Sequence, residues 1–187
     1  MKKALKTKNI IVGVSGGIAA YKTCELVRLL VKKGFSVKVV MTENATKFVG
    51  PLVFKELSMN PVHCDMFVSA GDMLVEHVSL AQWANLCIVA PCSANTLSKI
   101  ASGICDNLLT TLICALEQKT KVLLVPAMNE CMWQNPLIQE NVKKLKSFNK
   151  YILMNPAEGE LACGAYGQGR MPEPKDIMSK AISISGK

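Results

Sequence analysis

The chain has 187 residues, 50% of them hydrophobic, and a formal net charge of +8 from 22 basic and 14 acidic residues. A chain of this length folds most simply as one domain that buries roughly 70% of its unfolded surface. Its apolar runs are much shorter than the ~20 residues that cross a bilayer, and its lysines lack the interleaved aromatic residues of a stacking surface for nucleic acid. We therefore expect neither a membrane nor a nucleic-acid partner.

The cysteines and histidines indicate no disulfide framework and no metal centre. Eight cysteines occur without a Cys-x-x-Cys pair, so most are predicted to be small buried hydrophobes in a reducing cytoplasm. Neither His63 nor His77 lies at a zinc-ligand spacing from a cysteine pair. The basic N-terminus is followed by an apolar run that is too short for an export signal and ends in glycines. That run is predicted to be the first strand.

Strand and helix patterns alternate from this point. The first half of the chain predicts, in order, a strand over 9–14, a turn at Ser15-Gly16-Gly17, a helix over 18–32, a strand over 36–41, a short helix reaching Phe48, a helix over 51–58, a brief strand over 61–63 and a helix over 77–83. Gly34 ends the first helix, and Thr42 is suited to cap the short helix that follows the second strand.

Two apolar strands in the second half, 86–90 and 122–125, are each predicted to end at a proline, which cannot donate to a ladder. Between and after them the sequence predicts helices over 93–101, 106–117 and 136–148, a strand over 151–154 and a final helix from about Pro174. The stretch from 158 to 170 holds four glycines, and a flexible loop is predicted there, with a lid at about 156–171. The alternation predicts a doubly wound, mainly parallel α/β sandwich formed by a single domain, 1–187.

Polar residues follow the predicted strands at the carboxyl edge of this sheet, where open parallel sheets bind ligands. Gly16 and Gly17 permit close approach of a phosphate to a helix N-terminus, although tight packing would also explain them. Ser93 could bind a ligand or merely cap its helix, and Asn129 could be an ordinary turn residue. Several such tips on one edge favour a single site for a mononucleotide-sized ligand with one phosphate.

A series of short motifs then resembles the flavin-dependent cysteine decarboxylase family over about residues 9–178. The motifs are Ser15-Gly16-Gly17-Ile18-Ala19-Ala20-Tyr21-Lys22, Glu76-His77-Val78-Ser79-Leu80 with Trp83, Ala90-Pro91-Cys92-Ser93-Ala94-Asn95-Thr96, Gly103-Ile104-Cys105-Asp106-Asn107-Leu108-Leu109-Thr110, Pro126-Ala127-Met128-Asn129 with Met132-Trp133, and Leu161-Ala162-Cys163-Gly164. The occurrence of all these motifs in this order is specific to that family. Family members often have Asp at position 85 and a small residue at position 92, where this chain has Asn85 and Cys92.

The resemblance implies FMN as the cofactor, a Rossmann-like or flavodoxin-like fold, and homotrimers or multiples of trimers with the flavin near subunit boundaries. It implies His77 as the base, Asn129 as the ligand of the substrate carboxylate, and Cys163 as the proton donor. The flavin contacts that it implies are Gly16, Gly17, Ile18, Thr42, Asn44, Ser93, Ala94, Asn95, Thr96 and Ala127. A neutral amide such as Asn129 can hold a carboxylate without a charge that would oppose its loss as carbon dioxide.

The implied reaction belongs to coenzyme A biosynthesis in the cytoplasm. The cysteinyl thiol of 4'-phosphopantothenoylcysteine is oxidised to a thioaldehyde, carbon dioxide leaves, and the enethiol is reduced to 4'-phosphopantetheine. Many bacterial relatives carry a second domain, and this chain is expected to be the decarboxylase alone. The alternatives are a peptidyl-cysteine decarboxylase, which would stop at the enethiol, a flavin prenyltransferase, and a non-catalytic flavoprotein subunit that regulates a phosphatase. Cys163 argues against the first of these, and His77 with Asn129 against the second.

Overall fold

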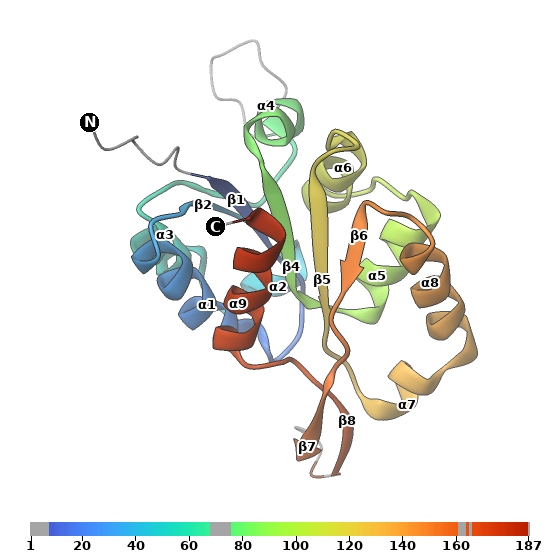
Figure 1. Ribbon diagram of the computed structural model, residues 1–187. Helices are drawn as coiled ribbons and strands as arrows, with labels where there is room; N and C mark the ends of the chain where they lie inside the picture. Colours follow the sequence, from blue (N-terminus) through green and yellow to red (C-terminus); the bar gives the residue numbers. More distant parts are fainter. Residues whose placement is uncertain (1–7, 68–75, 161–163, 165, 187) are drawn as a thin grey trace.

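Six parallel strands form the central sheet of the computed structural model, which describes residues 8–67, 76–160, 164 and 166–186 (Figure 1). They are β1 (Asn9–Val14), β2 (Ser36–Met41), β3 (Val62–His63), β4 (Leu86–Cys92), β5 (Lys121–Pro126) and β6 (Tyr151–Leu153), and their order is β3-β2-β1-β4-β5-β6. The order reverses between β1 and β4, which places a switch point beside the carboxyl end of β1. The predicted α/β class is confirmed.

Helices cover both faces of the sheet, which explains why the central strands are apolar on both sides. All seven residues of β4 are buried. One face packs against α1 (Ala20–Lys32), α3 (Pro51–Ser58) and α9 (Pro174–Ser185), and the other against α4 (Glu76–Trp83), α5 (Ala94–Ser102), α6 (Leu108–Ala115) and α8 (Pro136–Lys146). The short helices α2 (Glu43–Thr46) and α7 (Glu130–Gln134) follow the carboxyl ends of β2 and β5.

The predicted strand ends at Ala90 and Val125 are one or two residues too early. β4 continues through Pro91 to Cys92, which pairs with Pro126 at the end of β5 after a register shift. A proline that ends a strand keeps its carbonyl, and the carbonyl of Pro91 accepts a hydrogen bond from the Ser15 amide. Pro91 is the residue before the last one of β4, and Pro126 is the last residue of β5, so both prolines belong to the strands that they help to end.

The prediction of a loop without strands over 158–170 is wrong for the described residues of that stretch. β7 (Ala157–Glu160) and β8 (Tyr166–Arg170) form an antiparallel hairpin with a register shift after Ala157. The glycines weakened the strand pattern in the sequence. In the structure Gly159 is part of β7 and takes a φ of +149°, a value that favours glycine. The helix α7 also escaped prediction, since its five residues are too few to show a helical period.

The expectation that most cysteines are buried is confirmed for Cys87 and Cys92 and is wrong for Cys105, Cys114 and Cys131, which are exposed. Burial raises the pKa of the Cys87 thiol to about 12. Cys105 and Cys131 lie on the α5–α6 connection and on α7, whereas Cys114 lies on α6, whose apolar segment had indicated burial. Over the described part of the chain, no helix has the length and apolar character to cross a membrane.

Lys150 is a buried cation that closes the end of α6. It is 8% exposed, and its Nζ donates to the carbonyls of Ile113 (3.3 Å) and Leu116 (2.8 Å). Burial lowers its pKa, so its ammonium loses the proton at lower pH in the folded chain than in the unfolded one. Its contribution to the free energy of unfolding therefore rises with pH up to the unfolded value of about 10.4.

Replacing Lys150 with methionine is expected to lower the free energy of unfolding by about 1–3 kcal/mol, because two buried carbonyls lose their donor while the apolar stem remains. Urea unfolding followed by far-UV circular dichroism measures the change. Lys146→Met on the exposed side of α8 is the matched control. Equal unfolding midpoints for the two variants would contradict the capping role.

Candidate functional site

A cavity of about 640 Å³ opens at the carboxyl edge of the sheet, beside the switch point between β1 and β4. It is lined by the turn after β1 and the start of α1, the turns after β4 and β5, and the β7–β8 hairpin. The lining residues are Gly16, Gly17, Ile18, Ala19, Tyr21, Lys22, Pro91, Ser93, Ala94, Ala127, Met128, Asn129, Met132, Glu160, Gly169, Arg170 and Met171. Its volume is typical of pockets that hold small organic ligands.

Ser15 fixes the turn after β1 to the turn after β4. Its buried hydroxyl donates to the Pro91 carbonyl at 2.8 Å and accepts from the Ser93 amide at 2.8 Å. Gly16 follows, where an added Cβ would lie 2.6 Å from the Cβ of Asn44. The turn therefore needs glycine to approach the start of α2, and its backbone faces the cavity.

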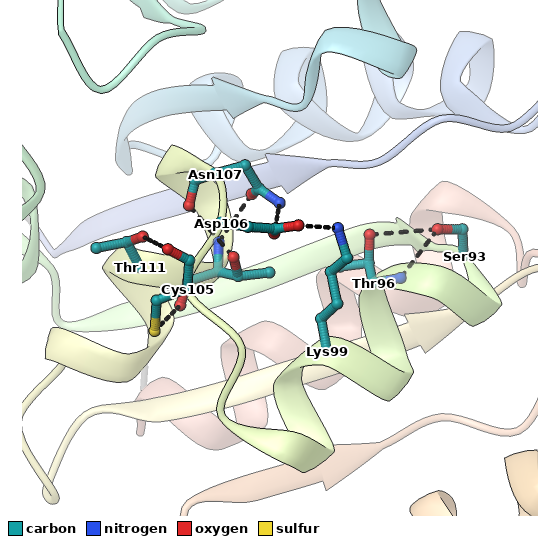
Figure 2. Close-up of polar contacts among 8 residues, drawn as sticks. Ser93, Thr96, Lys99, Cys105, Asp106, Asn107 and Thr111 are labelled. Carbon is teal, nitrogen blue, oxygen red and sulfur yellow. Dashed lines mark hydrogen bonds and ion pairs between the residues drawn. The ribbon is translucent and has the colours of Figure 1, made fainter.

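Ser93 caps the start of α5 (Figure 2), and it also lines the cavity. Its Oγ accepts from the Thr96 amide at 3.3 Å and donates to the Thr96 hydroxyl at 3.2 Å. Thr42 likewise caps α2 by accepting from the Ala45 amide. The capping interpretation, left open from the sequence, thus holds for both hydroxyls. Ser93 combines it with a place in the cavity, whereas Thr96 is buried behind it.

Asn129 follows β5 and caps α7, where its side chain accepts from the Cys131 amide at 2.9 Å. It is exposed to solvent and lines the cavity. The preceding residue, Met128, donates its amide to the Gly169 carbonyl at 3.0 Å. The turn after β5 is therefore bonded directly to the hairpin, and both line the cavity.

Of the residues singled out from the sequence, the cavity brings together Gly16, Gly17, Ile18, Ser93, Ala94, Ala127 and Asn129. Thr42, Asn44, Asn95 and Thr96 lie behind or beside its lining. His77 lies apart, half-buried in the first turn of α4, which packs on α6 against the other face of the sheet. Cys163 lies outside the described residues.

The histidine to which the sequence analysis assigned no role, His63, has a partner in the structure. His63, at the end of β3, contacts the carboxylate of Glu76, the residue before His77, through its Nδ1. This contact links positions 13 apart in the chain and joins β3 to the first turn of α4. Within the described ranges no cluster of three or more His, Cys, Asp or Glu side chains is arranged to hold a metal ion.

The sequence argument missed a charged group on one side of the cavity. Lys22 Nζ lies 2.7 Å from the carboxylate of Glu173, and Arg170 Nη2 lies 3.7 Å from the same group. The hydrogen bond from Lys22 and the attraction of both cations lower the pKa of Glu173. Lys22 and Arg170 are 148 positions apart in number, and each alone reads as an ordinary surface residue, so no local pattern links them.

The family model described as Flavoprotein matches residues 1–185. Among curated proteins, the chain is 43% identical over 177 residues to the coenzyme A biosynthesis bifunctional protein CoaBC of Bacillus subtilis, covering 95% of this chain and 43% of that protein. It is 40% identical over 174 residues to a probable phosphopantothenoylcysteine decarboxylase of Streptococcus mutans, covering 93% of this chain and 97% of that one. The chain thus spans less than half of the bifunctional relative and nearly all of the shorter one.

Two solved structures are similar over 97% of the chain. One is a cysteine-to-serine mutant of PPC decarboxylase complexed with pantothenoylaminoethenethiol, at 32% identity, a TM-score of 0.86 and coverage of 100% of that chain. The other is the FMN binding protein AtHal3, at 32% identity, a TM-score of 0.82 and coverage of 99% of that chain. The similarity includes the elements that surround the cavity.

Proposed function

Since the chain belongs to the Flavoprotein family, we propose that it is an FMN-dependent enzyme that decarboxylates 4'-phosphopantothenoylcysteine to 4'-phosphopantetheine in coenzyme A biosynthesis. The observation that carries the proposal is the cavity that places the Gly16–Gly17 turn, Ser93 and Asn129 around one space at the carboxyl edge of the sheet. The similarity to a probable phosphopantothenoylcysteine decarboxylase over 97% of its length supports the same substrate.

The residues around the cavity fit FMN. Gly16 presents bare backbone to the cavity, and Ile18 and Tyr21, each 60% exposed in the single chain, add apolar surface beside it. Gly16, Gly17, Ile18, Ser93, Ala94 and Ala127 would hold the cofactor, with Thr42, Asn44, Asn95 and Thr96 proposed behind them. When bound, FMN supplies two-electron redox chemistry to the cysteinyl part of the substrate.

Three side chains carry the proton and binding steps in this proposal. His77 accepts the proton of the substrate thiol, a task suited to an imidazole near neutral pH. The amide of Asn129 binds the carboxylate that is lost as carbon dioxide. Cys163 delivers a proton to the carbon of the enethiol, and we propose that it does so from a lid at about 156–171. Lys22 and Arg170 line the cavity and share the Glu173 carboxylate, and we propose that these two cations also help to hold the phosphate of the substrate.

The separation of His77 from the cavity supports an oligomeric site. His77 is on α4, against the face of the sheet opposite α1, while the cavity lies beside the N-terminus of α1. We propose that the protein assembles as a homotrimer, or a multiple of trimers, in which a neighbouring copy supplies His77 to the cavity. In this proposal each copy is a single domain with its core at about 9–178. We propose that the assembly lies in the cytoplasm, where reduced thiols persist.

Purified protein is expected to be yellow, with FMN bound non-covalently, because the cavity has room for one mononucleotide-sized ligand. Acid release of the flavin followed by chromatography identifies it, and release of carbon dioxide from 4'-phosphopantothenoylcysteine then tests the activity. Recovery of FAD would contradict the proposed cofactor. FMN-loaded protein that releases no carbon dioxide would contradict the proposed reaction.

A further inference from the structure

Glu130 connects two segments that line the cavity, the start of α7 and the β7–β8 hairpin. We call Asn129 and Met132 the helix side, since both belong to the start of α7, and Glu160, Gly169 and Arg170 the hairpin side. Glu130 is the first residue of α7. Figure 1 shows α7 and the β7–β8 hairpin at the same end of the sheet, and α7 contacts β8 directly.

The carboxylate of Glu130 accepts one hydrogen bond from the hairpin and one from its own helix. Its Oε1 accepts from the backbone amide of Gln168 in β8 at 3.3 Å and from the side chain of Gln134 in α7 at 3.3 Å. The Gln168 bond joins positions 38 residues apart. A charged acceptor makes such bonds stronger than a neutral one, so Glu130 holds β8 against α7 beside the Met128–Gly169 backbone bond.

Glycine at position 167 makes this contact possible. A Cβ there would overlap the Glu130 carboxylate, with Oε2 the nearest atom. The φ of Gly167 is not in the range reserved for glycine, so alanine is compatible with the backbone and would act by displacing the carboxylate. Since a glutamate side chain can swing away, the substitution would break the contact and leave the hairpin intact.

We propose that Glu130 is a positioning residue that fixes the distance between Asn129 and the hairpin side of the cavity, and thereby sets the affinity for the substrate. The proposal depends on the function proposed above, because it assigns Asn129 to the substrate carboxylate. Glu130 does not touch the reacting atoms in this proposal. It acts through the hairpin, so it affects substrate binding and leaves the chemical step unchanged.

The contact itself is tested without substrate. Hydrogen–deuterium exchange of peptides covering 166–170 should be faster in Glu130→Ala than in the wild-type protein, because the Gln168 amide loses its acceptor. Glu158→Ala removes an exposed carboxylate from the same hairpin and is the control. Unchanged exchange in Glu130→Ala overturns the proposal whether or not the protein is a decarboxylase.

The role is tested by steady-state kinetics on the FMN-loaded wild-type protein, Glu130→Ala, Gly167→Ala and the double variant. We expect KM to rise roughly tenfold in each single variant, as for loss of one charge-assisted hydrogen bond, with kcat and FMN content unchanged. The double variant should match the single ones, because alanine at 167 has no carboxylate to displace when Glu130 is absent. Glu130→Gln keeps an acceptor oxygen and should restore most of the affinity.

Three results overturn the proposal: an unchanged KM in Glu130→Ala, a loss confined to kcat, or additive effects in the double variant. A glutamine variant as impaired as the alanine variant also overturns it, because the charge and not the contact would then matter. If the wild-type protein releases no carbon dioxide, the proposed function fails, and the exchange measurement still decides the contact.

Discussion

Asparagine in place of His77 is expected to slow oxidation of the substrate by about 100- to 10,000-fold, the usual contribution of a general base. An amide has nearly the shape of the imidazole but takes up no proton near neutral pH. Stopped-flow absorbance at the oxidised flavin band, after addition of 4'-phosphopantothenoylcysteine, measures the rate. FMN content should be unchanged, since the variant alters none of the residues proposed to hold the cofactor. Bleaching at the wild-type rate would remove His77 from the mechanism.

The same variant tests whether the active site is shared between copies. Asn129→Asp should be inactive because its carboxylate repels that of the substrate. Co-expression of this variant with His77→Asn should restore about a quarter of the sites, if each site pairs the cavity of one copy with His77 of another and copies associate at random. If each site used residues of one chain, every chain would carry a lesion and co-expression would restore nothing.

Serine in place of Cys163 is expected to permit decarboxylation and block the final reduction. A hydroxyl is a much weaker acid than a thiol, so protonation of the enethiol carbon should stall. The variant should release carbon dioxide once and accumulate the aminoenethiol, which mass spectrometry distinguishes from 4'-phosphopantetheine by two hydrogens. The similar structure of a cysteine-to-serine PPC decarboxylase mutant with pantothenoylaminoethenethiol supports this expectation.

The result also separates the proposed function from its alternatives. A peptidyl-cysteine decarboxylase would release the enethiol with or without a thiol at position 163. A non-catalytic phosphatase subunit would release no carbon dioxide in either form. Formation of 4'-phosphopantetheine by Cys163→Ser at the wild-type rate would show that Cys163 is not the proton donor.

The sequence predicted the elements whose pattern is strong and local. β4 and β5 are continuous apolar runs with a proline among their last two residues, and both strand ends at the cavity were expected within two residues. The β7–β8 hairpin was missed because its strands contain glycines, which weaken a strand pattern, and because its bond to Glu130 joins positions 38 residues apart.

Only those residues of the candidate site that follow a strand could be predicted, because their position depends on local sequence. Gly16, Ser93 and Asn129 each lie within three residues of the end of a strand, so parallel topology alone places them on one edge. His77 follows no strand, and its distance from the cavity depends on how α4 packs across the sheet. The salt bridge between Lys22 and Glu173 joins α1 to the residue before α9, across 151 positions, and only the folded chain reveals it.

The shared hydroxyl of Ser15 has a consequence for redesign of substrate range. Because the Ser15 hydroxyl is hydrogen-bonded to both Pro91 and Ser93, the turns after β1 and β4 are braced against each other. Enlarging either turn would therefore disturb the other. Among the described residues, the hairpin is bonded to the start of α7 and the turn before it through the Glu130–Gln168 and Met128–Gly169 hydrogen bonds, and it carries its own glycines. Libraries that seek acceptance of bulkier thiol acids should therefore vary the hairpin and leave the braced turns untouched.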